Sequence, residues 1–109
     1  AYLRNNELYD MGTYEIKLNT LLNKNRILHP TVCFRTKSIK KLPFLYEDYY
    51  EYAEDYKLWV TATLHGLRIF SDSYPVIHYN LLSKEEEYYK IQKQSADKIN
   101  KLLYILFFS

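Results

Sequence analysis

The sequence predicts an α+β domain: a single antiparallel sheet with one mid-chain helix and a long C-terminal amphipathic helix, in the order ββαβββα. Three observations lead to this prediction. Several short segments alternate between apolar and polar residues, the C-terminal segment repeats apolar residues at helical spacing, and turn residues separate the segments. The chain has 109 residues, which favours one compact domain over residues 1–109.

The first two strands are expected in the N-terminal part of the chain. Residues 1–12 are polar and irregular, and we interpret them as a loop or the remnant of an earlier strand. Residues 13–20 alternate between apolar and polar side chains, which predicts a half-buried strand. Residues 27–39 are ambiguous, because alternation around Val32 favours a second strand and a hairpin, whereas Pro30 suits the first position of a helix.

A mid-chain helix is expected from Pro43 onward. Its predicted stripe has the period of an α-helix and consists of Leu45, Tyr49, Tyr52 and Tyr56. The five carboxylates between Glu47 and Asp55 fall on its other faces. Such a charge run is typical of a solvated face, and the functional alternative is a partner-binding face.

Three strands are expected after this helix. Residues 58–64 alternate and are rich in β-branched and aromatic side chains, which indicates a strand. His65-Gly66 predicts a tight turn into a return strand at residues 67–70. Residues 71–73 predict a second turn, and a third short strand is expected at residues 76–79.

The last segment predicts a long amphipathic helix that covers one face of the sheet. Ser83 to Glu86 has the pattern of a capping box, and the glutamates there suit the helix dipole. The predicted apolar stripe consists of Tyr88, Ile91, Ser95, Ile99, Leu102 and Leu106.

Composition excludes several classes of function. The single cysteine, Cys33, cannot form an internal disulfide, so we expect a reducing, intracellular compartment such as the cytoplasm. No signal-peptide pattern and no apolar run of about 20 residues occurs, so no membrane span is expected. The histidines lack metal-binding spacing and no nucleotide-binding motif is present, so we expect no metal and no cofactor. Cys33 is expected to be a small core residue; the alternative is a nucleophile with His65 or His78 as its base, and we expect no catalytic residues.

The tyrosines carry the most functional content. Thirteen occur, and those between residues 46 and 56 are too many for one buried helix face. Exposed tyrosine is typical of interface hot spots, and codon bias with core packing is the alternative explanation. Two C-terminal phenylalanines would extend an apolar patch used for self-association or partner docking. We therefore predict a non-enzymatic protein-interaction domain whose partner-binding residues are Tyr46, Glu47, Asp48, Tyr49, Tyr50, Glu51, Glu54, Phe107 and Phe108.

Nucleic-acid binding is the alternative function. The formal net charge of +2 is too small to indicate nucleic acid by itself, but lysines can neutralise phosphate while tyrosines stack on bases. The contacting residues would be Arg35, Lys37, Lys40, Lys41, Lys93, Lys98 and Lys101. A third hypothesis is a small viral or mobile-element protein whose acidic helix, residues 47–55, mimics DNA and inhibits a host factor.

Part of the chain resembles a known family. The middle of longin-fold trafficking proteins, including the small subunits of the TRAPP tethering complex, has a strand–turn–strand that is similar to Tyr56-Lys57-Leu58, Thr63, Gly66-Leu67-Arg68-Ile69-Phe70 and Ser71-Asp72. The stretch before the last helix of SNARE longin domains resembles Ser73-Tyr74-Pro75-Val76 and Leu81-Leu82. The resemblance implies the longin fold and a non-enzymatic surface of sheet and helix that docks a protein partner in a membrane-traffic complex.

Overall fold

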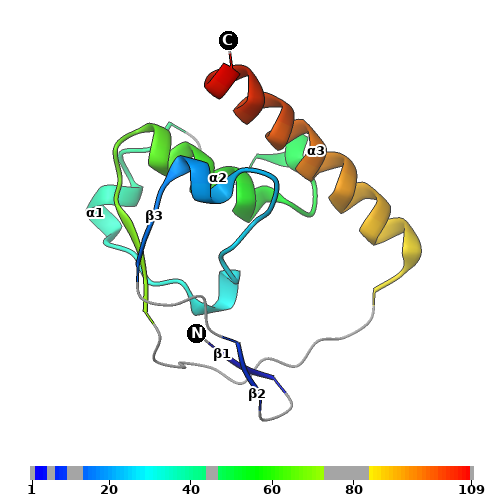
Figure 1. The fold of residues 1–109 in the computed structure, drawn as a ribbon, viewed down its shortest axis with the longest axis horizontal. Coiled ribbons are helices and arrows are strands. Elements are labelled where there is room, and N and C mark those ends of the chain that lie inside the picture. Colours follow the sequence, from blue (N-terminus) through cyan, green and yellow to red (C-terminus); the bar gives the residue numbers. More distant parts are fainter. Residues whose placement is uncertain (1, 5–6, 10–13, 44–46, 73–83, 109) are drawn as a thin grey trace.

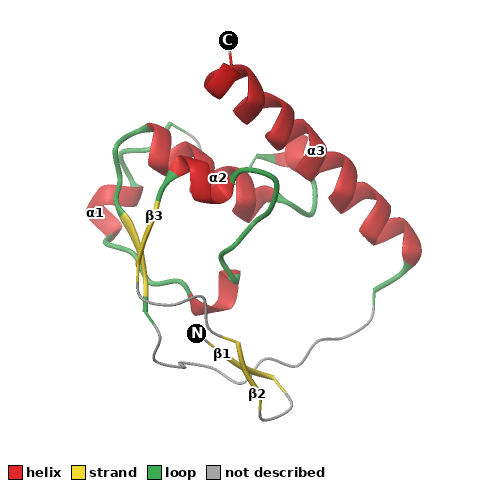
Figure 2. Cartoon of the chain, in the orientation of Figure 1, coloured by secondary structure: helices red, strands yellow, loops and turns green. Residues whose placement is uncertain are grey.

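The computed structural model describes residues 2–4, 7–9, 14–43, 47–72 and 84–108. Its two largest elements are the helices α2 (Glu54–Leu64) and α3 (Glu86–Phe108). Helix α3 runs along one side of the molecule, and α2 lies between it and the strand pair that contains β3 (Figures 1 and 2). The fold is therefore α+β with a long C-terminal helix, as the sequence predicted.

The remaining elements are short, and the strands form two sheets of two strands each. Strand β1 (Tyr2–Arg4) pairs antiparallel with β2 (Glu7–Tyr9), and β3 (Tyr14–Ile16) pairs antiparallel with β4 (Ile69–Ser71). Helix α1 comprises Thr36–Ile39. Single 3₁₀ turns occupy Leu18–Leu21, His29–Thr31 and Asp48–Tyr50.

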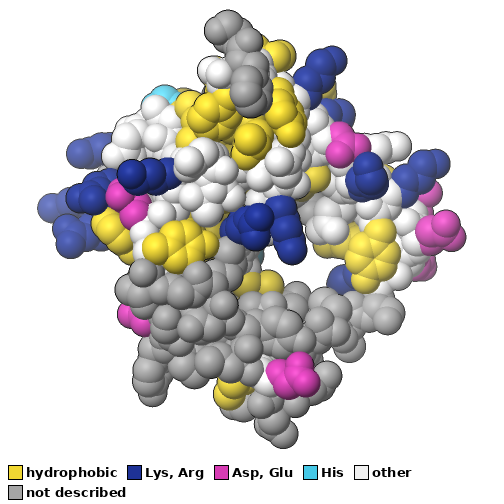
Figure 3. Space-filling model, viewed as in Figure 1, with side chains coloured by type: hydrophobic (Ala, Val, Ile, Leu, Met, Phe, Trp, Pro, Cys, Tyr) yellow, Lys and Arg dark blue, Asp and Glu magenta, His cyan; other side chains and the backbone are white. Residues whose placement is uncertain are grey.

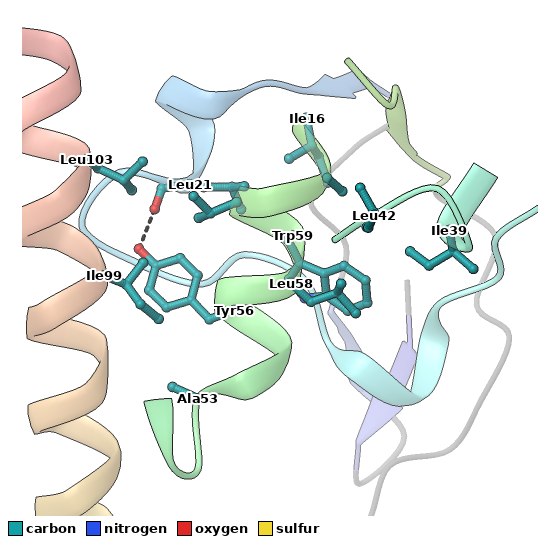
Figure 4. Packing of buried hydrophobic residues seen from close by; sticks show 12 residues of the cluster. Ile16, Leu21, Ile39, Leu42, Ala53, Tyr56, Leu58, Trp59, Ile99 and Leu103 are labelled. Atoms are coloured by element: carbon teal, nitrogen blue, oxygen red, sulfur yellow. Dashed lines mark hydrogen bonds between the residues drawn. The ribbon is translucent and has the colours of Figure 1, made fainter. Parts of the chain in front are cut away.

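Helix α2 is the centre of the hydrophobic core. All residues from Leu58 to Ala62 are buried, and so is Tyr56. Figure 4 shows α3 and Leu21 on one side of α2, and Ile16, Ile39 and Leu42 on the other. A helix that is enclosed on opposite sides loses the polar face from which an amphipathic period is recognised. The core consists of Ile16, Leu21, Ile39, Leu42, Ala53, Tyr56, Leu58, Trp59, Val60, Ala62, Ile99 and Leu103.

Gly66 ends helix α2 and turns the chain toward β4. Its φ of 83° lies in the left-handed region, which glycine adopts without steric cost. The Leu67 N–H donates to the Ala62 carbonyl oxygen at 3.0 Å, and the Gly66 N–H donates to that of Thr63 at 3.1 Å. This pair of hydrogen bonds is the Schellman motif, which satisfies carbonyls at a helix end. The turn predicted at His65-Gly66 is present, but it follows a helix and not a strand.

The predicted order ββαβββα is not confirmed, and the described strands form two sheets instead of one. The strand predicted at residues 58–64 is wrong, because these residues lie in α2. Every residue from Leu58 to Ala62 is buried, so the sequence shows no polar helix face there. The return strand at residues 67–70 is present as β4, but its partner is β3. The strand predicted at residues 76–79 lies outside the described residues.

The helix predicted from Pro43 is also wrong, because α2 begins at Glu54. The residues before it contain a single 3₁₀ turn, and Tyr52 has a positive φ of 62°, which interrupts a right-handed helix. Residues 27–39 contain the 3₁₀ turn His29–Thr31, which includes Pro30, and the helix α1, but no strand. Of the two alternatives left open there, the strand with its hairpin is therefore wrong. Within the described part of the predicted strand, residues 14–20, only Tyr14–Ile16 form a strand.

Helix α3 is present, but its buried face differs from the predicted stripe. Ser95 and Ile99 are buried as expected, and the next buried position is Leu103. Leu102 is only half-buried, and Leu106 is 47% exposed. The buried stripe therefore continues from Ile99 to Leu103 at a spacing of four residues. The predicted stripe, which continues through Leu102 and Leu106, turns away from the core. Ser83, the expected cap, lies outside the described residues.

Candidate functional site

The backbone of residues 47–53 is held against α3 by polar side chains. The Gln92 side-chain amide donates to the Tyr52 carbonyl oxygen at 3.1 Å, and the Ser95 hydroxyl donates to the Glu51 carbonyl oxygen at 2.7 Å. The carbonyl groups of Glu51 and Tyr52 lie outside the regular helices, and these side-chain donors satisfy them. The segment is therefore fixed through its main chain, which leaves its side chains available for other contacts.

Tyr52 connects this segment to two tyrosines of α3. Its ring centroid lies 4.1 Å from that of Tyr88, with an angle of 34° between the ring planes. The Tyr88 and Tyr89 rings meet edge to face at 5.6 Å. The positive φ of Tyr52 is unfavourable for a side chain with a Cβ, and the hydrogen bond from Gln92 together with the ring contact holds it.

Lysine side chains lie over the tyrosine rings. The Lys98 ammonium is 4.1 Å from the centroid of the Tyr49 ring and donates to the Tyr49 carbonyl oxygen at 3.5 Å. The Lys57 ammonium is 5.0 Å from the centroid of the Tyr50 ring, and Tyr49 packs edge to face on Tyr50 at 5.0 Å. Such cation–π contacts restrict the rings to defined orientations.

We call the five residues Tyr49, Tyr50, Tyr52, Tyr88 and Tyr89 the tyrosine surface. Tyr49 is 67% exposed and Tyr89 is 45% exposed, while the other three are half-buried. Burial raises the pKa of Tyr50, and the nearby Glu47 carboxylate raises it further. The tyrosine surface thus consists of two groups of contacting rings, Tyr49 with Tyr50 and Tyr52 with Tyr88 and Tyr89, each with one exposed ring.

The carboxylates around the tyrosine surface do not form one acidic face. Glu47 forms an ion pair of 2.8 Å with Lys57, in which the two side chains are 22% and 11% exposed. Asp55 accepts a hydrogen bond from the Asn25 side chain at 3.2 Å. Asp48 and Glu51 are exposed, and Glu54 is half-buried. The predicted acidic helix is therefore wrong as an element, although exposed carboxylates do flank the tyrosines.

A shallow groove of about 330 Å³ lies beside the tyrosine surface. It runs between the turn at residues 23–25, the start of α2 and the middle of α3. Aromatic walls are provided by Tyr52 and Tyr89, and polar groups by Asp55 and Lys93, among other residues. An aromatic wall with a few polar groups is typical of a ligand-binding pocket.

A polar network below the groove fixes the turn at residues 23–25. The Tyr56 hydroxyl donates to the carbonyl oxygen of Leu21, and it lies 3.1 Å from the Asn100 side-chain oxygen. That oxygen also accepts the Asn23 N–H at 2.6 Å. Burial raises the pKa of Tyr56 to about 12. The Tyr104 hydroxyl donates to the Asn23 side-chain oxygen at 2.7 Å, which completes the network.

The predicted basic residues lie in two separate places. Arg35, Lys37, Lys40 and Lys41 are exposed in and around α1, which Figure 1 shows on the opposite side of the molecule from α3. Lys93, Lys98 and Lys101 are exposed on α3, where Lys93 pairs with Asp97 at 3.1 Å. Of these residues, the structure places Lys98 over the Tyr49 ring and Lys93 in the groove lined by Tyr52 and Tyr89.

The other predicted site residues have different outcomes. Cys33 is exposed, so the expectation that it is a core residue is wrong. Phe107 is 40% exposed in the last turns of α3, which end at Phe108. Tyr46 lies outside the described residues, and so does His78. Among the described residues, no group of three or more His, Cys, Asp or Glu side chains could hold a metal ion.

Sequence reasoning missed the residues that build the site. Gln92, Ser95 and Asn100 are polar residues of α3 whose side chains bond main-chain groups far away in the sequence. Ser95 in the predicted apolar stripe did indicate such a contact, because a buried hydroxyl group requires a hydrogen-bond partner. Gln92 and Asn100 offered no comparable signal, since polar residues on a helix usually face water.

Comparison with protein-family models, with curated proteins and with solved structures yields no significant match. Among the described residues, no helix combines the length and the apolar character needed to cross a membrane.

Proposed function

We propose that the chain is a non-enzymatic protein-interaction domain that binds a protein partner through its tyrosine surface. One observation carries the proposal: the ring contact of 4.1 Å between Tyr52 and Tyr88 joins two tyrosine-rich segments that are far apart in the sequence. Tyrosine supplies a large contact area and loses little conformational entropy on binding. Rings that are already fixed lose even less.

The rim of this surface and the adjacent groove also suit a protein partner. In Figure 3, both basic and acidic side chains surround the hydrophobic ones beside the N-terminal half of α3. A mixed polar rim around aromatic residues is the usual anatomy of a protein–protein interface. The groove between Tyr52 and Tyr89 would receive one anchoring side chain of the partner.

The test uses two exposed tyrosines that lie outside the core. Peptides that bind the wild-type chain are selected from a displayed peptide library, and their affinities are measured for a Tyr49→Ala/Tyr89→Ala variant. We expect the affinity to fall at least about tenfold, because exposed aromatic anchors dominate such interfaces. Phe70→Ala is the matched control, since Phe70 is an aromatic residue, 62% exposed, on β4.

Two outcomes would contradict this proposal. One is a selection that yields no binding peptide, and the other is a set of peptides that binds the tyrosine variant as tightly as the wild type. Thermal unfolding of both variants shows whether they retain the fold.

Nucleic-acid binding is the second candidate function. The observation in its favour is Lys98 above the Tyr49 ring, which combines a cation with a stacking platform. The exposed carboxylates of Asp48 and Glu51 beside this ring oppose it. Fluorescence anisotropy with labelled single-stranded DNA and RNA at low salt tests it, with Lys98→Gln/Lys101→Gln as the variant. Affinity that falls steeply with salt would support it, and no binding would eliminate it.

Two further hypotheses stay predictions. A DNA-mimicking inhibitor requires a row of carboxylates, and the ion pair between Glu47 and Lys57 removes one charge from that row. A longin-like trafficking role depends on the resemblance of residues 56–76 and 81–82, of which the structure describes residues 56–72. Residues 56–64, which would form a strand in that resemblance, form a helix here. The proposal of a tyrosine surface depends on neither hypothesis.

A further inference from the structure

The last two turns of α3 expose apolar side chains at four successive positions. Tyr104 is 43% exposed, Ile105 56%, Leu106 47% and Phe107 40%. Successive residues of an α-helix are rotated by about 100°, so four of them point in every direction around the axis. We call Tyr104–Phe107 the tip of α3. The tip is therefore apolar around its whole circumference, unlike the rest of α3.

This distribution determines what kind of surface could cover the tip. A single groove on a protein covers mainly one side of a helix, and enclosure on opposite sides, as for α2, requires separate elements on each side. Ile105 and Leu106 are each about half exposed and are separated by about 100° around the axis. A surrounding apolar medium covers both directions at once, and the outer hydrocarbon of a lipid bilayer is such a medium.

Basic residues lie at the base of the tip. Lys101 is exposed one turn before Ile105. Lys24 is also exposed, and it follows Asn23, whose side-chain oxygen accepts the Tyr104 hydroxyl at 2.7 Å. In Figure 3, hydrophobic side chains gather next to the C-terminal end of α3, and Lys or Arg side chains flank them on one side. This arrangement is complementary to a surface that is anionic outside and apolar inside.

Among the residues that the structure describes, the acidic side chains near the tip cancel only part of this charge. Asp97 lies one turn before Lys101 and pairs with Lys93 at 3.1 Å. Asp55 lies near the turn at residues 23–25, where it accepts a hydrogen bond from Asn25. The neutral Asn25 amide leaves the charge of Asp55 in place, so Asp55 offsets part of the charge of Lys24, and Lys101 remains to attract an anionic surface.

We propose that the tip of α3 inserts into the surface of an anionic lipid bilayer, with Lys24 and Lys101 at the headgroups. The four residues of the tip rise by about 6 Å along the helix axis, so insertion of the tip reaches only the headgroup region and the outermost acyl chains. The Tyr104 ring would lie at the level of the headgroups, where tyrosine is enriched. The proposed insertion is independent of the tyrosine surface.

Flotation with lipid vesicles tests the proposal directly. The purified chain is mixed with phosphatidylcholine vesicles that either lack or contain phosphatidylserine, and the bound fraction is measured. We expect binding to the anionic vesicles, and a loss of at least about tenfold in Ile105→Ser/Phe107→Ser, since two apolar side chains no longer insert. Lys101→Gln is expected to weaken binding about fivefold, and only to the anionic vesicles.

Matched controls separate insertion from general hydrophobicity. Phe34 is 47% exposed and Phe70 is 62% exposed, and both lie outside α3. Phe34→Ser and Phe70→Ser should therefore bind vesicles as the wild type does. Leu106→Ser is a milder tip variant that replaces the double variant if circular dichroism shows that the latter has lost helix.

Three results would overturn the proposal. The chain could fail to float with either vesicle, or the controls could lose binding as much as the tip variants. Sedimentation could also show a dimer that the tip variants convert to a monomer while vesicle binding is unchanged. That last result would assign the tip to a second copy of the chain, and the tyrosine surface would be unaffected in each case.

Discussion

The Asn100 side-chain oxygen lies 3.1 Å from the Tyr56 hydroxyl and accepts the Asn23 N–H at 2.6 Å. The side-chain nitrogen of Asn100 donates to the Ala96 carbonyl oxygen at 3.0 Å, so the orientation of its amide is fixed. One residue of α3 therefore contacts both α2 and the turn at residues 23–25. This network supports the floor of the groove and the base of the tip.

Tyr56→Phe is expected to destabilise the fold by about 1–3 kcal/mol. The substitution removes the hydroxyl that donates to the carbonyl oxygen of Leu21, a residue with 0% exposure, and leaves that acceptor buried. Urea denaturation followed by circular dichroism measures the loss. Tyr104→Phe is the matched control, because Tyr104 is 43% exposed and water can replace its hydrogen bond. Equal losses in the two variants would contradict the role of the Tyr56 hydroxyl.

Alkaline pH is expected to unfold the protein partly through Tyr56. Its pKa is about 12 in the folded state, above the ordinary value of 10 that applies when the chain is unfolded. The folded state therefore holds the proton more tightly. The resulting stability is present in full below pH 10 and is lost as the pH rises from 10 toward 12. Urea denaturation across this interval should show a smaller fall in Tyr56→Phe, and identical pH profiles would contradict the assignment.

The sequence identified α3 far better than α2, and burial explains the difference. Helix α3 has a water-exposed face, so its charged residues revealed an amphipathic period. Helix α2 is buried from Leu58 to Ala62, and its apolar and β-branched residues therefore alternated by chance like those of a strand. The pairing of β3 with β4 is a contact between distant segments of three residues each, which are too short to show a pattern.

Glu47→Gln is expected to reduce the free energy of unfolding by about 1–3 kcal/mol. The Lys57 side chain is only 11% exposed, and it would keep its charge without the carboxylate that lies 2.8 Å away. Its remaining contacts are the Thr61 hydroxyl at 3.1 Å and the Tyr50 ring. Chemical denaturation measures the change.

The exposed pair between Lys93 and Asp97 provides the control for that variant. Its side chains are 78% and 65% exposed, so Asp97→Asn should change stability by less than about 0.5 kcal/mol. A comparable loss in both variants would show that the burial of Lys57 does not matter.

Gly66→Ala is expected to cost about 1 kcal/mol of stability. No heavy atom lies within 4 Å of the position that a Cβ would occupy, so the cost arises from the φ of 83° alone. Gly66→Asn should cost less, because asparagine tolerates this region better than alanine. Thermal unfolding of the two variants checks this order, and an alanine variant as stable as the wild type would contradict it.

Only part of the candidate site could be predicted from the sequence. The tyrosines between residues 46 and 56 were identified, and the structure shows that Tyr49 is exposed. Of their partners, Tyr88 was predicted in the apolar stripe of the last helix and Tyr89 was not identified, because the ring contact between Tyr52 and Tyr88 requires the turn that precedes α2. That turn depends on the positive φ of Tyr52, which no residue type near it signals.

Leu103→Ala is expected to destabilise the protein by about 2–5 kcal/mol, because Leu103 is fully buried against the core. Leu106→Ala is the matched control: it makes the same chemical change in the same helix, but Leu106 is 47% exposed. The control should cost less than about 1 kcal/mol. The sequence pattern alone predicted the reverse, with Leu106 in the buried stripe. Urea denaturation of the two variants therefore decides which face of α3 packs on α2, and a larger loss in Leu106→Ala would contradict the packing described here.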